Sequence, residues 1–236
     1  MKHIIRATFL FITIGWSFSA QAIPLTLTQL TGITGGTPAG TAVYQADLSS
    51  VGVSNLASIT ISDNSAGLGG AAGQFSGFDL DAIILSTTDC ASASCAAGLV
   101  GLGLFDFSPA GTLFTPGTQR LPADSKLFGT DAGGTNVDNL VATLGVFDGN
   151  STTAIPGADG FVSMGDNGIL SFNLTSLVST GGLFMYIGEV GNNGEVAASS
   201  IEISNRPVNV PEPSALMLMG LSLVGLGLSR KKYRNG

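Results

Sequence analysis

The chain has 236 residues, of which 44% are apolar, 34 are glycine and 11% are charged. This length holds one modest domain with short additional segments, and the apolar content excludes a disordered polyelectrolyte. Between Ile23 and Asn209 there are three basic and fifteen acidic residues. A surface of this charge repels phosphate, which excludes a nucleic-acid-binding role.

The first 22 residues have the pattern of a secretory signal peptide. Lys2 and Arg6 precede an apolar run from Ala7 to Phe18, and Ala20 and Ala22 supply the small residues of a cleavage site. The alternative is an uncleaved membrane anchor, but the run is only about twelve residues long, whereas a span needs ~20. We therefore predict export and cleavage after Ala22.

Residues 23–209 are predicted to form one all-β domain. Short runs of alternating apolar or β-branched residues are bounded by Gly, Asn, Asp, Ser or Pro, and no run keeps a helical period over three turns. Without intervening helices, this pattern predicts a single antiparallel β-sandwich or jelly-roll-like fold. The predicted strands are Leu25–Leu30, Ala42–Leu48, Ala57–Ser62, Leu80–Ser86, Leu99–Phe107, Leu140–Phe147, Ile169–Leu174, Leu183–Val190 and Val196–Ser204. The expected core aromatics are Phe75, Phe78, Phe105, Phe107, Phe114, Phe128, Phe147, Phe161, Phe172 and Phe184.

Cys90 and Cys95 are the only cysteines, and an exported protein meets an oxidising compartment. We predict a disulfide between them that closes a small hairpin loop. A metal site at these thiolates would need further soft ligands, and no histidine is present in the predicted mature chain to supply them.

The composition does not favour an enzyme. The single histidine, His3, lies in the predicted signal peptide, so Ser-His and Cys-His pairs are not available after cleavage. A hydrolase with paired carboxylates remains open as the least favoured alternative, because carboxylates are abundant. A carbohydrate-binding module is a further alternative, although Tyr44 and Tyr186 are almost the only aromatic platforms for a sugar ring. We expect no catalytic residue and no obligatory cofactor.

Calcium is the one ligand that the acidic residues favour. Asp79 and Asp81 lie two apart in a predicted strand, so both carboxylates should project from one face. Glu189 and Glu195 flank the loop Gly191-Asn192-Asn193-Gly194. Oxygen-rich loops of this kind bind Ca²⁺, but none of them matches an EF-hand. The four residues are candidate calcium ligands, and the alternative is that they are solvated acidic loops.

The C-terminal segment 210–236 has three parts. Val210-Pro211-Glu212-Pro213 is followed by an uncharged run from Ser214 to Ser229 and then by Arg230-Lys231-Lys232. An apolar run that ends in basic residues predicts a transmembrane helix with the basic cluster on the cytoplasmic side. The domain at 23–209 would then lie outside the inner membrane, in agreement with the signal peptide.

This three-part segment resembles the PEP-CTERM sorting signal of Gram-negative bacteria; similar segments are also described as the C-terminal domain of ice-binding proteins. The resemblance implies an exosortase as partner, a membrane protease that cuts near Pro211, Glu212 and Pro213. Ice binding itself requires flat arrays of regularly spaced threonines, and Thr26 and Thr28 form only one such pair.

Together these patterns predict an exported surface or matrix protein, anchored in the membrane by its C-terminal helix and then transferred to the cell surface or the medium. We expect a structural or adhesive role in an exopolysaccharide layer. The alternative is a calcium- or carbohydrate-binding module.

Overall fold

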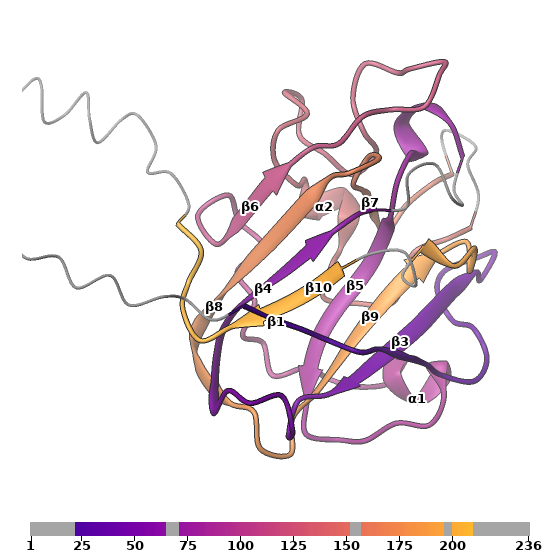
Figure 1. The fold of residues 1–236 in the computed structure, drawn as a ribbon. Coiled ribbons are helices and arrows are strands. Elements are labelled where there is room, and N and C mark those ends of the chain that lie inside the picture. Colours follow the sequence, from indigo (N-terminus) through magenta and orange to yellow (C-terminus); the bar gives the residue numbers. More distant parts are fainter. Residues whose placement is uncertain (1–21, 65–70, 152–156, 196–199, 210–236) are drawn as a thin grey trace, which may run out of the picture.

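Two five-stranded antiparallel sheets pack face to face in a sandwich (Figure 1). The computed structural model describes residues 22–64, 71–151, 157–195 and 200–209. One sheet has the order β1 (Ala22–Pro24), β10 (Ser200–Ser204), β4 (Asn55–Ser62), β8 (Ile169–Ser179) and β6 (Thr112–Thr115). The other has the order β2 (Thr28–Gln29), β3 (Thr41–Asp47), β9 (Phe184–Val190), β5 (Asp79–Ser86) and β7 (Val162–Ser163). The all-β sandwich predicted from the sequence is confirmed.

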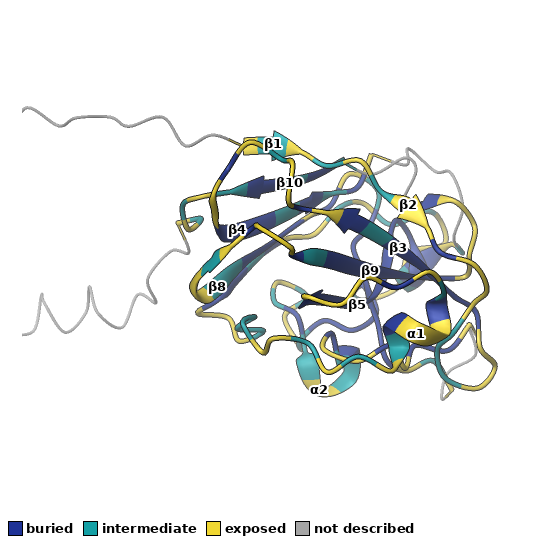
Figure 2. Ribbon diagram, turned by 90° about the horizontal axis from the view of Figure 1, so that it is seen from below, coloured by how far each residue is buried: buried dark blue, intermediate teal, exposed yellow. Residues whose placement is uncertain are grey.

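The core lies between the two sheets because alternate residues of each central strand face inward. Ile59 of β4 pairs in register with Ile203 of β10 and Phe172 of β8, and all three side chains are fully buried. In the other sheet Ile187 of β9 pairs with Ile83 of β5 in the same way. Figure 2 shows the buried residues, in dark blue, along β4 and β10 of one sheet and β9 and β5 of the other. Seven of the ten predicted core phenylalanines are buried, whereas Phe105, Phe107 and Phe184 are only partly so.

Two predicted strands do not form. Leu99–Phe107 runs along the edge of β5 with one ladder-like bond, from the Leu102 N–H to the Leu85 carbonyl, and the left-handed φ of +62° at Gly103 interrupts an extended strand. Leu140–Phe147 begins instead in a short helix, α2 (Asn139–Ala142), because the Asp138 carboxylate caps it by accepting from the Leu140 N–H at 3.1 Å. The expectation of a domain without helices was therefore wrong.

A second short helix, α1 (Ala93–Ala97), carries the predicted disulfide. Cys90 and Cys95 are bonded, with 5.6 Å between their Cα atoms. The bridge closes the first turn of α1 and not a hairpin, because Ser92 caps this helix by accepting from the Cys95 N–H. Buried Ala93 and Ala96 pack α1 onto the outer face of the β3–β9–β5 sheet. A single 3₁₀ turn at Gly73–Phe75 completes the helical elements of the described ranges.

Both ends of the described chain lie on the same side of the sandwich (Figure 1). Ala22 pairs with Ser204, since β1 and β10 are antiparallel neighbours. Cleavage after Ala22 would leave Ile23 paired with Ile203 at the new N-terminus. No helix in the described ranges is long and apolar enough to cross a membrane, and the span predicted at Ser214–Ser229 lies outside those ranges.

Replacing Phe172 tests the aromatic contact between β8 and the segment at 99–107. Its ring meets Phe105 and Phe107 edge-on, at centroid distances of 5.8 and 5.7 Å. We expect Phe172→Ala to lower the free energy of unfolding by about 3–5 kcal/mol, because it leaves a cavity in a closed core. Chemical denaturation measures this change. Leu177→Ala on the exposed part of β8 is the control and should stay within about 0.5 kcal/mol of the unsubstituted chain; an equal loss in both variants would contradict the assignment of the core.

Candidate functional site

Three of the four candidate calcium ligands come together at one end of the sandwich. Asp79 opens β5, Glu189 lies near the end of β9, and Glu195 follows in the next loop. The pairing of Leu80 with Glu189 brings β5 and β9 side by side, so that Asp79 lies near Glu189. The exposed fractions of the three residues are 6%, 0% and 0%, respectively. We call Asp79, Glu189 and Glu195 the carboxylate cluster.

Each carboxylate of the cluster has a different set of partners. The Ser163 hydroxyl donates to Asp79, and the Asn193 N–H donates to Glu189 Oε2 at 3.2 Å. The backbone N–H of Glu195 donates to Asn193 Oδ1 at 3.2 Å. Among the residues that the structure describes, none donates a hydrogen bond to the buried Glu189 Oε1. A buried acceptor without a donor is costly, so the cluster is under electrostatic strain.

One guanidinium faces this negative charge. Arg120 Nη2 lies 3.6 Å from Glu195 Oε1, and its Nε donates to Asp166 Oδ1 at 3.1 Å. Asp63, just after β4, also acts on Glu195 through its charge. Sequence reasoning did not assign Arg120, because it lies in a loop 75 residues before Glu195. Its isolation as one of three basic residues in the domain was the only available signal.

Burial raises the pKa of every member of the cluster, and repulsion from a neighbouring carboxylate adds to it. Desolvation is the largest cause and raises the pKa of Glu189 and of Glu195 to about 8. Repulsion by Glu195 adds to the effect on Glu189, whereas Arg120 opposes it at Glu195. The pKa of Asp79 is also well above its ordinary value, through burial first and the charge of Glu195 second. The cluster therefore holds protons near neutral pH.

Asp81 has a separate role. Its carboxylate accepts from the Thr41 hydroxyl at 2.6 Å and from the Gly149 N–H at 2.9 Å. These bonds tie the loop around residue 149 to β3 and β5. A side chain at Gly149 would approach Asp81 within 2.9 Å, so the close contact requires glycine. Burial raises the pKa of Asp81 to about 7. The charges that act on Asp79 are those of Glu195, Glu189 and Arg120, whereas the charge that acts on Asp81 is that of Asp148.

The structure shows no preformed metal site in its described residues. In the parts of the chain that the structure describes, no three His, Cys, Asp or Glu side chains are arranged to hold a metal ion. The calcium site at the carboxylate cluster stays a prediction. The two tyrosines expected as sugar platforms, Tyr44 and Tyr186, are 7% and 0% exposed, so neither offers its ring face to a ligand.

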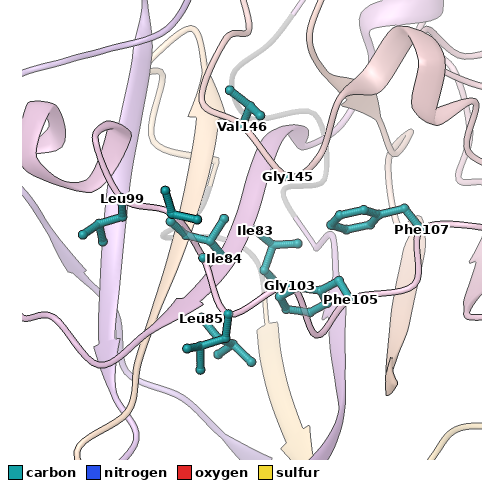
Figure 3. Close-up of a pocket in the computed structure, with 12 residues that line it drawn as sticks. Ile83, Ile84, Leu85, Leu99, Gly103, Phe105, Phe107, Gly145 and Val146 are labelled. Carbon is teal, nitrogen blue, oxygen red and sulfur yellow. The ribbon is translucent and has the colours of Figure 1, made fainter. Parts of the chain in front are cut away.

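A second feature is an apolar pocket beside β5, with a volume of about 340 Å³ (Figure 3). Ile83, Ile84 and Leu85 form its floor, and the segment at 99–107 and the loop at 145–146 form its walls. Every lining residue is apolar or glycine, and Val100 is 94% exposed. The pocket forms because the segment Leu99–Phe107 runs beside β5 with only one ladder-like bond and does not pair with it as a strand.

The predicted sorting residues have to be identified from the sequence. The motif Val210, Pro211, Glu212 and Pro213, the basic residues Arg230, Lys231 and Lys232, and Ala20 all lie outside the described ranges. A family model of the PEP-CTERM protein-sorting motif matches residues 209–231. The chain carries a PEP-CTERM sorting motif. This PEP-CTERM motif implies an exported protein that is anchored at its C-terminus and processed by an exosortase.

No curated protein and no solved structure matches the chain. The PEP-CTERM motif covers the end of the sequence and assigns a destination, whereas any role of the sandwich has to be argued from its own residues.

The raised pKa values predict an unusual pH dependence of stability. Because protonation is easier in the native cluster than in the unfolded chain, the contribution of the cluster to stability is highest at low pH and falls as pH rises from about 5 through 8. We expect Glu189→Gln, which removes one of these groups, to raise the melting temperature at pH 9 by about 5 °C, the equivalent of roughly 2 kcal/mol. Thermal scans from pH 5 to 9 measure this change. The control, Glu202→Gln on β10, should leave the pH profile unchanged; a profile that rises with pH would contradict the burial of these groups.

Proposed function

We propose that the sandwich is the mature part of an exosortase-sorted surface or matrix protein, with a structural or adhesive role in an exopolysaccharide layer. The PEP-CTERM motif at residues 209–231 is the observation that carries this proposal. The motif directs the chain to an exosortase, and the sandwich is the part of the chain that remains after the exosortase has cut.

Three features of the sandwich support delivery outside the membrane. The disulfide Cys90–Cys95 suits an oxidising compartment. The excess of acidic residues keeps the domain away from anionic lipid headgroups. Both ends of the domain point to the same side, so a signal peptide and a C-terminal span can occupy one membrane while the sandwich stays beside it.

A non-catalytic role agrees with the position of the carboxylates. Paired-carboxylate hydrolysis needs two acids that face a substrate cleft and a water molecule. Asp79, Glu189 and Glu195 are instead buried between strands, and Asp81 is occupied by its backbone donors. Their contacts suit protons or a cation better than a glycan.

Calcium binding is a second candidate function, favoured by one observation. Glu189 Oε1 is a buried carboxylate oxygen with no donor in the described part of the chain, and the charges of Asp79 and Glu195 interact with that of Glu189. A divalent cation would relieve this repulsion, and the Asn192–Asn193 loop brings additional oxygens to the same place. Binding would require the side chains to close around the ion.

Substitution of the sorting motif tests the main proposal. In a host that contains an exosortase, we expect the native chain to lose its C-terminal segment and to appear in the exopolysaccharide fraction. Glu212→Ala should leave most of the protein at full length in the membrane, because the enzyme no longer finds its motif. Mass spectrometry of the C-terminus and fractionation measure both effects. Glu202→Ala is the matched control, and equal release of both variants would contradict the proposal.

Calcium titration tests the second candidate. If the site has an affinity typical of extracellular modules, 10 mM Ca²⁺ should stabilise the chain by about 3 kcal/mol, since a ligand at a hundredfold excess over its dissociation constant does so. Calorimetry with and without Ca²⁺ measures this effect, and Glu189→Gln should abolish it while Glu202→Gln does not. A melting temperature that Ca²⁺ leaves unchanged would remove this candidate.

A further inference from the structure

Hydrogen bonds to Ser204, Ser58 and Asn173 hold the segment between β10 and the sorting motif. After β10 ends at Ser204, the Arg206 N–H donates to Ser204 Oγ at 3.1 Å, and the Ser58 hydroxyl donates to the Arg206 carbonyl at 2.6 Å. The Val208 N–H then donates to Asn173 Oδ1 at 2.8 Å, and Asn173 Nδ2 donates to the Val208 carbonyl at 3.0 Å. The segment thus crosses β4 and β8 in turn, on its way to the motif that begins at residue 209.

Asn173 does for Val208 what a neighbouring strand would do. Its amide group satisfies both the donor and the acceptor of one backbone residue, which is the pairing of an antiparallel ladder. Asn173 follows Phe172 in β8, and Phe172 faces the core, so the amide stands on the outer face of the sheet. The backbone N–H of Asn173 is itself held by the Gly111 carbonyl at 2.8 Å. We call the two bonds between Asn173 and Val208 the clasp.

The clasp limits the length of chain that can leave the sandwich. Only Asn209 and Val210 separate Val208 from Pro211. At ~3.4 Å per residue, two residues reach about 7 Å, whereas the four residues from 207 to 210 reach about 14 Å once the clasp is open and Ser58 still holds Arg206. A protease binds an extended substrate on both sides of the cut. Residues 206–208 cannot enter its cleft while they are bonded to β4 and β8.

We propose that Asn173 is a positioning residue for sorting: its clasp restrains the chain beside the Pro-Glu-Pro motif, and the exosortase acts on the open form. This inference rests on the sorting function proposed above. The clasp is suited to opening and closing, because Asn173 and Val208 are only half-buried and each bond shifts an equilibrium by a factor of about 2–10. The folded sandwich therefore slows its own processing without preventing it.

The full chain in an exosortase-containing host tests the clasp. We expect Asn173→Ala to be processed about threefold faster than the native chain or more, measured by pulse-chase as the half-time of C-terminal cleavage. Asn173→Asp keeps the acceptor for the Val208 N–H but loses the donor to its carbonyl, so it should lie between the two. Asn55→Ala, which removes an exposed amide at the start of β4, is the matched control and should not alter the rate.

An insertion distinguishes restraint of the sorting motif by the clasp from a general loss of stability in Asn173→Ala. Six Gly and Ser residues placed between Val208 and Asn209 give the motif free length while the clasp stays closed. We expect this chain to be cut as fast as Asn173→Ala, and Asn173→Ala to add nothing in the inserted background. Hydrogen exchange should show faster exchange of the Val208 amide in Asn173→Ala, with the amides of β10 unchanged.

Several outcomes would overturn the inference. Equal cleavage rates for the native chain, Asn173→Ala and the inserted chain would show that the clasp restrains nothing. Slower cleavage of Asn173→Ala would show that Asn173 presents the motif and does not restrain it. If the native chain itself is never cut, the sorting function fails and the inference fails with it, a result distinct from equal rates among chains that are cut.

Discussion

The position of β10 between β1 and β4 is the constraint on which the rest of the molecule depends. Ile201 and Ile203 of β10 complete the core between the sheets, so the last strand cannot be removed without exposing it. The same pairing places Ala22 beside Ser204, which brings both ends of the domain together. It also directs residues 205–209 across β4 and β8, where Ser58 and Asn173 hold them. The sorted segment therefore begins directly on the folded sandwich.

The carboxylate cluster is a different consequence of strand pairing. The register of β9 with β5 puts Glu189 next to the start of β5, and burial follows because the sheets close over it. Buried carboxylates that lie close together have raised pKa values, because burial and repulsion both disfavour their charged forms. The sandwich thus accepts a local cost at one end, while its large apolar core supplies stability elsewhere. A chain released into an environment of varying pH would respond at this point.

Delivery and stability use separate parts of the molecule. The PEP-CTERM motif begins at Asn209, the last described residue, and assigns the destination. The disulfide, the core and the bonds of Asp81 keep the sandwich folded. The two parts meet at the clasp on Asn173, where a modest pair of hydrogen bonds joins the tail to the sheet. A sorting signal attached to a folded domain in this way becomes sensitive to the stability of that domain.

The sequence alone determined the properties that depend on local order or composition: the motif at the C-terminus, the all-β fold and the pairing of Cys90 with Cys95. It misassigned Leu99–Phe107 and Leu140–Phe147, because a short apolar run looks the same in a strand, a helix or a pocket wall. Only the tertiary structure decided three further features. These are the grouping of Asp79 with Glu189 and Glu195, the separate role of Asp81, and the bonds between Asn173 and Val208. Each joins residues far apart in the chain, and the register that brings such residues together depends on how both sheets pack at once.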